Sequence, residues 1–256
     1  MNQKTLWWIT HPGLSNEIVH FTKRIANEPN LNVAADIRVM DGHARLTSIL
    51  SQRRLRAHHP YWSQGNPCIC FTEATRDGLR EFVRRGLYEP WGLGFTKDHW
   101  FRRGAGPAFY VRGTDWAALE ESNLPPEIKT FATPFWPGAD PDPGEGPLEH
   151  HLARPTQWAH EREWRLSATD QEPLVPFELQ ALRLLVVPTE ASISTLVEAV
   201  PSLAAELPHI EVVVEASPGG TLEEVVAAEA APDFDPWDPN DPNNPYSDYI
   251  EDILRR

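Results

Sequence analysis

The stretch LRLLVVPTEASISTLVEAVPSLAAELPHIEVVVE, residues 182–215, carries the clearest fold signal in the chain. Apolar runs at 182–187 and 210–215 have the length of buried strands, and residues 192–206 between them place apolar side chains at helical spacing. A strand, a helix and a strand in this order usually form two parallel neighbouring strands joined by a right-handed crossover. We therefore expect a β-α-β unit here.

Upstream, short strands and helices alternate. Apolar patterns predict strands at residues 6–10, 17–22, 68–72, 91–95, 108–112 and 161–168, and helices at 42–52, 77–85, 115–121 and, downstream, 221–230. Asp41 is available to cap the helix at 42–52. The stretch Pro134–Pro147 holds five prolines and three glycines, so we expect neither a helix nor a central strand there. The pattern predicts an α+β fold: a core of two short sheets with flanking helices, ending in the β-α-β unit.

Composition indicates one α+β domain over residues 1–231 and an acidic tail over 232–256. The tail carries seven acids, two arginines and five prolines, and is expected to be mostly extended. No run approaches the roughly 18 apolar residues of a membrane span, and residues 1–10 lack the order of a signal peptide. Cys68 and Cys70 are too close in sequence to form a disulfide framework. We therefore expect a soluble, cytoplasmic protein with no membrane partner.

The formal net charge of −14 hides a basic segment. From Arg38 to Arg112 there are 13 basic against 6 acidic residues. Arginine forks pair with phosphate oxygens, so the segment suggests a site for a phosphorylated ligand. The alternative is that arginines such as Arg80, Arg84 and Arg85 form the solvated face of a helix. We also expect the acidic tail to fold back over this basic segment by long-range attraction.

The densest group of chemically active residues is the run HEREWR at residues 160–165. On a strand, Glu161, Glu163 and Arg165 share one face. Such a row is either a self-neutralising set of ion pairs or a catalytic carboxylate held by its neighbours. A structural row is the more common arrangement.

Polar side chains also occur in two other expected strands. His20 and Thr22 share a face, where an imidazole and a hydroxyl could bind an amide or a ribose; the alternative is a satisfied core histidine. Thr72 closes another strand, and strand ends often lie at ligand sites. The histidine and cysteine spacings do not fit a zinc site, so no metal is expected.

The order of these motifs resembles the ADP-ribosyltransferase fold: a strand with His20-Phe21-Thr22, a helix, the strand Cys70-Phe71-Thr72-Glu73, and a last strand with Glu-x-Glu. Separately, ICFTE at 69–73, WGLGFTK at 91–97, the strand at 107–111 and EREWR at 161–165 look like the AbiGi-type abortive phage-infection family. The two resemblances cover residues 20–187. His20 stands where one branch of transferases has arginine, and Phe71-Thr72-Glu73 replaces Ser-Thr-Ser.

The transferase resemblance implies NAD as substrate. Glu163 would stabilise the oxocarbenium-like state formed as the nicotinamide–ribose bond breaks, and Glu161 would orient the nucleophile. Arg165 would keep Glu163 ionised. His20 and Thr22 would hold NAD, Thr72 would brace the site, and Phe71 or Tyr110 would stack on nicotinamide. The diphosphate would bind to arginines near the His20 strand: Arg45, Arg53, Arg54 and Arg56.

The resemblances together imply an NAD-dependent transferase or NAD glycohydrolase of phage defence, with a protein, a nucleic acid or water as the acceptor. The alternative is a non-catalytic antitoxin or sensor that binds a cognate toxin partner. A pocket that unites Glu163, His20 and several arginines favours the enzyme. A site filled by the protein's own side chains favours the binding module.

Overall fold

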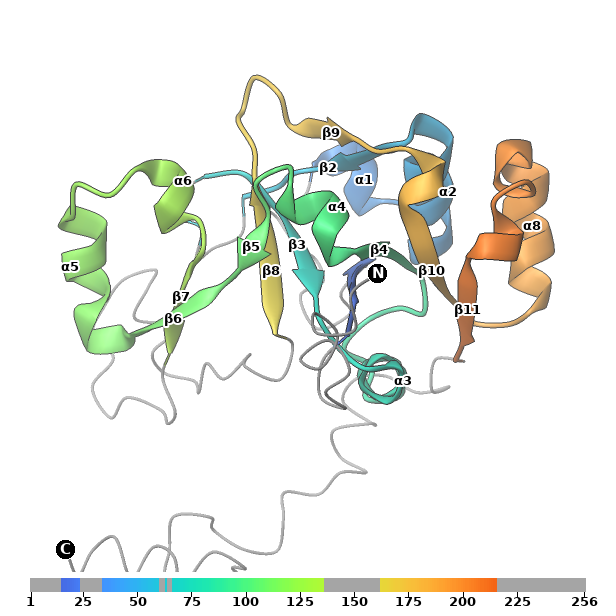
Figure 1. Ribbon diagram of the computed structural model, residues 1–256, viewed down its shortest axis with the longest axis horizontal. Coiled ribbons are helices and arrows are strands. Elements are labelled where there is room, and N and C mark those ends of the chain that lie inside the picture. Colours follow the sequence, from blue (N-terminus) through green and yellow to red (C-terminus); the bar gives the residue numbers. More distant parts are fainter. Residues whose placement is uncertain (1–14, 24–33, 60–62, 64–65, 136–161, 216–256) are drawn as a thin grey trace, which may run out of the picture. The chain divides into compact units, whose positions relative to one another are not determined.

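A computed structural model of the protein (Figure 1) describes residues 15–23, 34–59, 63, 66–135 and 162–215. The chain divides into two units, Met1–Ser217 and Pro218–Arg256, and all of the described residues belong to the first. The expected strand at 6–10, most of the proline-rich stretch, the expected helix at 221–230 and the acidic tail lie outside the described residues. The boundary at residue 231 and the expected folding of the acidic tail over the basic segment therefore stay predictions.

The first unit is built on a seven-stranded sheet in the order β11-β10-β4-β1-β3-β8-β5. Every neighbouring pair is antiparallel except β10 and β11, which are parallel as expected. The strands are β1 Glu17–Phe21, β3 Cys68–Thr72, β4 Gly92–Thr96, β5 Gly106–Pro107, β8 Glu163–Ser167, β10 Leu182–Val187 and β11 Glu211–Val214. The expected core of two short sheets is wrong, because β1 pairs with β3 on one side and β4 on the other and so joins them in one sheet.

Two smaller sheets accompany the main one. β2 (Arg54–Arg56) pairs antiparallel with β9 (Leu174–Pro176), and β6 (Phe109–Arg112) pairs in parallel with β7 (Ala132–Phe135). β7 includes Pro134, at the start of the stretch where no central strand was expected. β7 has a single strand neighbour among the described residues, and an edge strand tolerates a residue that lacks a backbone N–H.

The described α-helices are α1 Ala35–Arg38, α2 Gly42–Gln52, α3 Arg76–Arg84, α4 Lys97–Phe101, α5 Trp116–Glu121, α6 Pro126–Lys129 and α8 Ala191–Ala199. Four of them, α2, α3, α5 and α8, lie where the sequence predicted helices, and the short helices α1, α4 and α6 were not expected. α2 has the predicted bounds, and Asp41 caps it by accepting a hydrogen bond of 2.7 Å from the Ala44 N–H. α8 is shorter than the expected helix at 192–206 because Pro201 disfavours helical backbone at the residue before it.

Strand alternation gives the main sheet two different faces. One, the α2 face, packs Ile18, Phe71 and Leu93 against side chains of α2, α4 and α8. The other, the α3 face, packs Val19, Phe21 and Leu184 against α3. Figure 1 shows α3 on the opposite side of the sheet from α2 and α4. Whether a residue occupies an odd or an even position along its strand therefore decides whether its side chain lies on the α2 face or on the α3 face.

Gly94 lets β10 pack closely against β4 on the α3 face. It lies opposite Leu184, and a Cβ atom added at Gly94 would lie 2.7 Å from the Leu184 Cβ. That distance is far shorter than van der Waals contact, and both atoms belong to stiff backbone positions. The small residue is therefore required by the pairing of the two strands.

We expect Gly94→Ala to lower the free energy of unfolding by about 1–3 kcal/mol, because a well-packed core resists an added methyl group. Gly106→Ala is the matched control, since its added Cβ would meet only the Phe131 ring at 3.4 Å, an ordinary contact. Urea unfolding of both variants measures the difference. Equal stability of the two variants would show that the β4–β10 packing is not tight at Gly94.

Candidate functional site

The extended backbone of β8 directs Glu163 and Arg165 to the α3 face of the sheet and Trp164 to the α2 face. Glu163 lies opposite Thr72, and Arg165 lies opposite Cys70. The expectation that Glu163 and Arg165 share a face is confirmed by their ion pair, whose N–O distance is 2.8 Å. Glu161, the second predicted catalytic carboxylate, lies outside the described residues.

Arg165 is fully buried, with a side-chain exposure of 0%. A guanidinium has five N–H donors, and all five are used here. Nε and Nη2 donate to the two carboxylate oxygens of Glu163 at 2.9 and 2.8 Å, and Nη2 also donates to Thr133 Oγ1 at 2.6 Å. Nη1 donates to the carbonyl oxygens of Thr130 and Ala132, both at 2.7 Å. Arg165 therefore joins β8 of the main sheet to β7 of the small sheet.

Glu163 is the charge partner that makes this burial tolerable. Its side chain is 13% exposed, and both of its oxygens bind the guanidinium in a bidentate fork. Burial works to lower the pKa of Arg165, but the charge and hydrogen bonds of Glu163 outweigh it, and the pKa is raised. Arg165 therefore keeps its charge, and the carboxylate of Glu163 lies directly against it.

The same parity divides the other predicted site residues between the two faces. Thr72 lies beside Glu163, and Tyr110 of β6 lies opposite Thr133, the residue whose hydroxyl Arg165 binds. His20 and Phe71 lie on the α2 face, with ring centroids 5.9 Å apart. Predicted NAD contacts thus occur on both sides of the sheet rather than in one pocket.

His20 has a defined tautomer and a low proton affinity. Its Nδ1 lies 2.9 Å from the carbonyl oxygen of Cys70, which can only accept, so Nδ1 carries the proton. Burial lowers the pKa of His20, and the backbone hydrogen bond only partly opposes this. A neutral imidazole that is hydrogen-bonded to a backbone carbonyl matches the alternative stated for His20 in the sequence analysis, a core histidine with a hydrogen-bond partner.

Thr22 and Arg54 lie away from Glu163. Thr22 follows the carboxyl end of β1, where its hydroxyl lies 3.0 Å from the carbonyl oxygen of Gly42 and 3.2 Å from that of Trp91. Arg54 starts β2 and pairs with Pro176 of β9, which follows the carboxyl end of β8. Glu163 stands at the amino end of β8, and β1 runs in the same direction as β8, so Thr22 and Arg54 both lie toward the opposite end of the strands.

Arg45, one of the predicted diphosphate ligands, has a structural role. It is 6% exposed. Its Nε lies 3.1 Å from the carbonyl oxygens of Ile37 and Met40, and its Nη1 donates to the carbonyl of Thr22 at 3.2 Å. These bonds hold the end of α1 and the end of β1 against α2, and they occupy donors that a diphosphate would need.

A second cluster, Glu73, Lys97 and Trp164, escaped prediction from the sequence. Glu73 Oε1 pairs with Lys97 Nζ at 2.7 Å, and its Oε2 accepts from Trp164 Nε1 at 2.9 Å. The Lys97 ammonium also lies 5.7 Å from the centre of the Trp164 ring. The sequence does hold a signal for this ion pair: β3 and β4 both end in Phe-Thr, and the next residue is Glu73 after β3 and Lys97 after β4. Both strands pair antiparallel to β1, so their ends meet at one edge of the sheet.

The basic segment is largely neutralised by acidic side chains of the same unit. Arg76 of α3 pairs with Glu17 of β1 at 3.2 Å and with Glu211 of β11 at 2.7 Å. Arg84 pairs with Glu215 at 3.1 Å. On α3 the arginines therefore match the alternative reading, a helix face whose arginines are held by carboxylates rather than offered to a phosphate.

His58 and Cys70 lie near Glu163 and Arg165, whose charges act on both of them. His58 and Cys68 exchange backbone hydrogen bonds. Burial, followed by the charge of His20, lowers the pKa of His58 to about 4. Cys70 Sγ lies 3.8 Å from Cys68 Sγ, and this contact together with burial raises the pKa of the Cys70 thiol. Among the described residues, no three histidine, cysteine or acidic side chains gather as a metal site would require.

Comparisons with protein-family models, curated proteins and solved structures found no match for this chain. Among the helices that the structure describes, none has the length and apolar character needed to cross a bilayer.

We expect Arg165→Met to lower the free energy of unfolding by about 3–5 kcal/mol, or to prevent folding, because Glu163 and two carbonyl groups lose their partner. The control is Arg112→Gln, which breaks an ion pair with Asp115 in which Arg112 is 78% exposed, and which should cost less than about 1 kcal/mol. Urea unfolding measures both losses. Comparable small losses would mean that the buried network contributes no more than a surface pair.

Stability should fall as the pH falls from 6.5 toward 4. In this window the unfolded chain binds a proton at His58, whose ordinary pKa is 6.5, while the folded protein, with a His58 pKa of about 4, does not. The free energy of unfolding of the wild type should therefore decrease more between pH 7.5 and 5.5 than that of His58→Asn, as measured with urea at each pH. Identical decreases would show that His58 does not titrate in this way.

Proposed function

We propose that the chain is a non-catalytic binding module of a phage-defence toxin–antitoxin pair, acting in the cytoplasm. The motifs ICFTE, WGLGFTK and EREWR support the phage-defence role through their resemblance to the AbiGi-type family. In the folded chain, Glu73, Lys97 and Trp164 bring one residue of each motif into a single cluster. The motifs therefore act together as a framework. Both described cysteines are free thiols, which suits a reducing compartment.

The observation that favours a binding module over an enzyme is the closed Glu163–Arg165 pair. A carboxylate that assists NAD cleavage must present negative charge to a developing oxocarbenium ion. Here a guanidinium binds both carboxylate oxygens and cancels that charge. A pair with no net charge gives a cationic transition state little stabilisation.

The distribution of the predicted NAD contacts favours the same reading. His20, the residue expected to hold NAD, lies on the α2 face, whereas Glu163 lies on the α3 face. One NAD molecule would have to contact both sides of a sheet whose intervening strand, β3, is buried. Arg165 binds both carboxylate oxygens of Glu163, and Thr72 lies opposite it, so two of the protein's own residues take up contacts that NAD would need.

An NAD-dependent ADP-ribosyltransferase or NAD glycohydrolase is the second candidate. Thr72 and Tyr110 favour it, because both lie on the side of the sheet that carries Glu163. In that case Glu163 would be catalytic, and Arg165 would have to release one carboxylate oxygen when NAD binds. A protein or nucleic-acid acceptor would then be required for transfer.

Incubation of the pure protein with NAD labelled in the nicotinamide ring separates the two candidates. We expect no nicotinamide release above that of heat-inactivated protein, with or without RNA, DNA or cell extract, because Glu163 is neutralised. Glu163→Gln and His20→Ala should behave like the wild type. Saturable release that is lost in a folded Glu163→Gln variant would overturn the proposal and establish the enzyme.

A further inference from the structure

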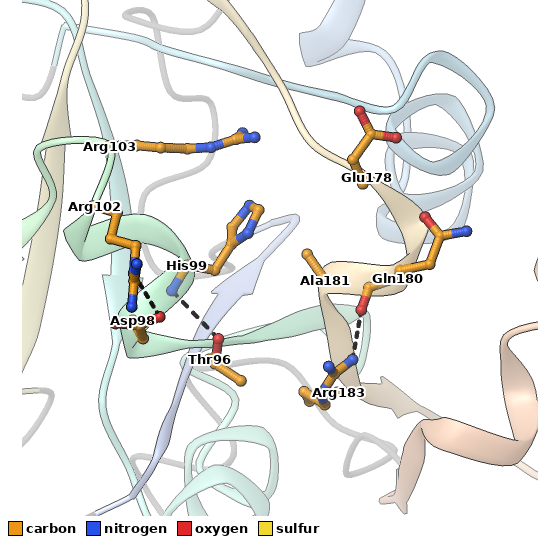
Figure 2. Close-up of a pocket in the computed structure, with 9 residues that line it drawn as sticks. All are labelled: Thr96, Asp98, His99, Arg102, Arg103, Glu178, Gln180, Ala181 and Arg183. Carbon is orange, nitrogen blue, oxygen red and sulfur yellow. Dashed lines mark hydrogen bonds and ion pairs between the residues drawn. The ribbon is translucent and has the colours of Figure 1, made fainter.

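A hollow of about 430 Å³ opens on the surface between α4 and the short 3-10 turn Leu179–Ala181, away from the Glu163 cluster. Figure 2 shows its lining. One wall is formed by Thr96, Asp98, His99, Arg102 and Arg103, and the other by Glu178, Gln180, Ala181 and Arg183. Its volume lies within the range of about 300–1,000 Å³ typical of small-molecule sites.

The charges around the hollow leave a surplus of cations. Arg102 is neutralised by Asp98, whose Oδ2 lies 2.8 Å from its Nε. Arg103 and Arg183 face the space from opposite walls, with Glu178 as the remaining acid. Two guanidinium groups against one carboxylate favour an anionic ligand.

Both arginines keep donors that the protein does not use. Arg183 donates from Nη1 to the carbonyl oxygens of Gln180 and Leu182, at 2.6 and 2.7 Å. Arg103 donates from Nη1 to the carbonyl of Pro176 and stacks over the Trp100 ring at 5.4 Å. Among the described residues, the Nε and Nη2 groups of both arginines have no hydrogen-bond acceptor. These contacts hold the side chains in place and leave N–H groups to bind a ligand.

His99 lies between the two arginines. Its backbone N–H donates to Thr96 Oγ1, and its ring stacks on Phe95, with centroids 6.2 Å apart. Ring atom Nε2 is buried and has no hydrogen-bond partner among the described residues. Burial and then the charges of Arg103 and Arg183 lower the pKa of His99, while Asp98 and Glu178 oppose them less strongly. The charges of both arginines thus act on the ring that lies between them.

We propose that this hollow binds a small phosphorylated ligand, with its phosphate oxygens on Arg103 and Arg183 and a hydroxyl group of the ligand donating to Glu178. A phosphate uses the fork geometry of arginine. Glu178 would repel a bare phosphate, so its presence favours an ester whose remaining part carries a donor. The inference does not depend on the proposed function.

Titrations observed through the NMR signals of the His99 ring test the site with three probes: inorganic phosphate, ribose 5-phosphate and ribose. We expect saturable shifts with both phosphates and none with ribose. Ribose 5-phosphate should bind several-fold more tightly than inorganic phosphate, because its hydroxyl groups reach Glu178. Equal affinity would limit the ligand to the phosphate group alone and overturn the role of Glu178.

Charge variants test the assignment of each residue. Arg103→Gln and Arg183→Gln should each weaken phosphate binding about tenfold, the loss expected for a charged hydrogen bond. Glu178→Gln should strengthen the binding of inorganic phosphate and remove the advantage of ribose 5-phosphate. Arg112→Gln, an exposed arginine outside the hollow, is the control and should bind as the wild type does.

The three substituted residues of the hollow, Arg103, Glu178 and Arg183, are exposed, so the variants should fold, which their thermal unfolding checks. The proposal is overturned if neither phosphate shifts the His99 signals at concentrations up to about 10 mM. It is also overturned if Arg103→Gln and Arg183→Gln bind phosphate as tightly as Arg112→Gln.

Discussion

The buried guanidinium of Arg165 is the constraint on which the region around β8 depends. A cation with no exposed surface persists only if every donor finds an acceptor and an opposite charge lies in contact. Thr130, Ala132 and Thr133 supply the acceptors from the segment that forms β7, and Glu163 supplies the charge. The guanidinium therefore ties β7 to β8, in addition to the backbone pairing of β5 with β8 that leads into β6.

Strand parity explains why residues that look like one site in the sequence separate in space. Neighbouring side chains on a strand lie on opposite faces of the sheet, so on β3 Phe71 lies on the α2 face and Thr72 lies on the α3 face. At the strand ends, by contrast, three distant motifs meet in the contacts among Glu73, Lys97 and Trp164. Strand alternation separates the predicted NAD contacts, and the meeting of strand ends brings the three motifs together, which is why we favour a binding module over an enzyme.

Local sequence patterns predicted most of the helices and strands, but they did not predict which strands distant in the sequence pair with each other. The cap at Asp41, the apolar run of β3 and the β-α-β pattern depend on neighbours in sequence, and each appears where the pattern indicated. The single sheet was not predictable, because no local pattern shows that β1 pairs on both sides. The shared face of Glu163 and Arg165 follows from alternation, but the carbonyl acceptors of Arg165 belong to Thr130 and Ala132, which lie 35 and 33 positions away in the sequence. The hollow at His99 depends on similar distant contacts.

The most direct test of the account is the ¹⁵N NMR spectrum of the arginine side chains. If Arg165 uses all five donors, rotation about its Cζ–Nη bonds is slow, and separate Nη signals should persist at pH 8 and 25 °C. The exposed guanidinium of Arg112 should give one averaged Nη signal in the same sample. An averaged signal from Arg165 as well would contradict the closed network and, with it, the argument that Glu163 is held as a structural partner.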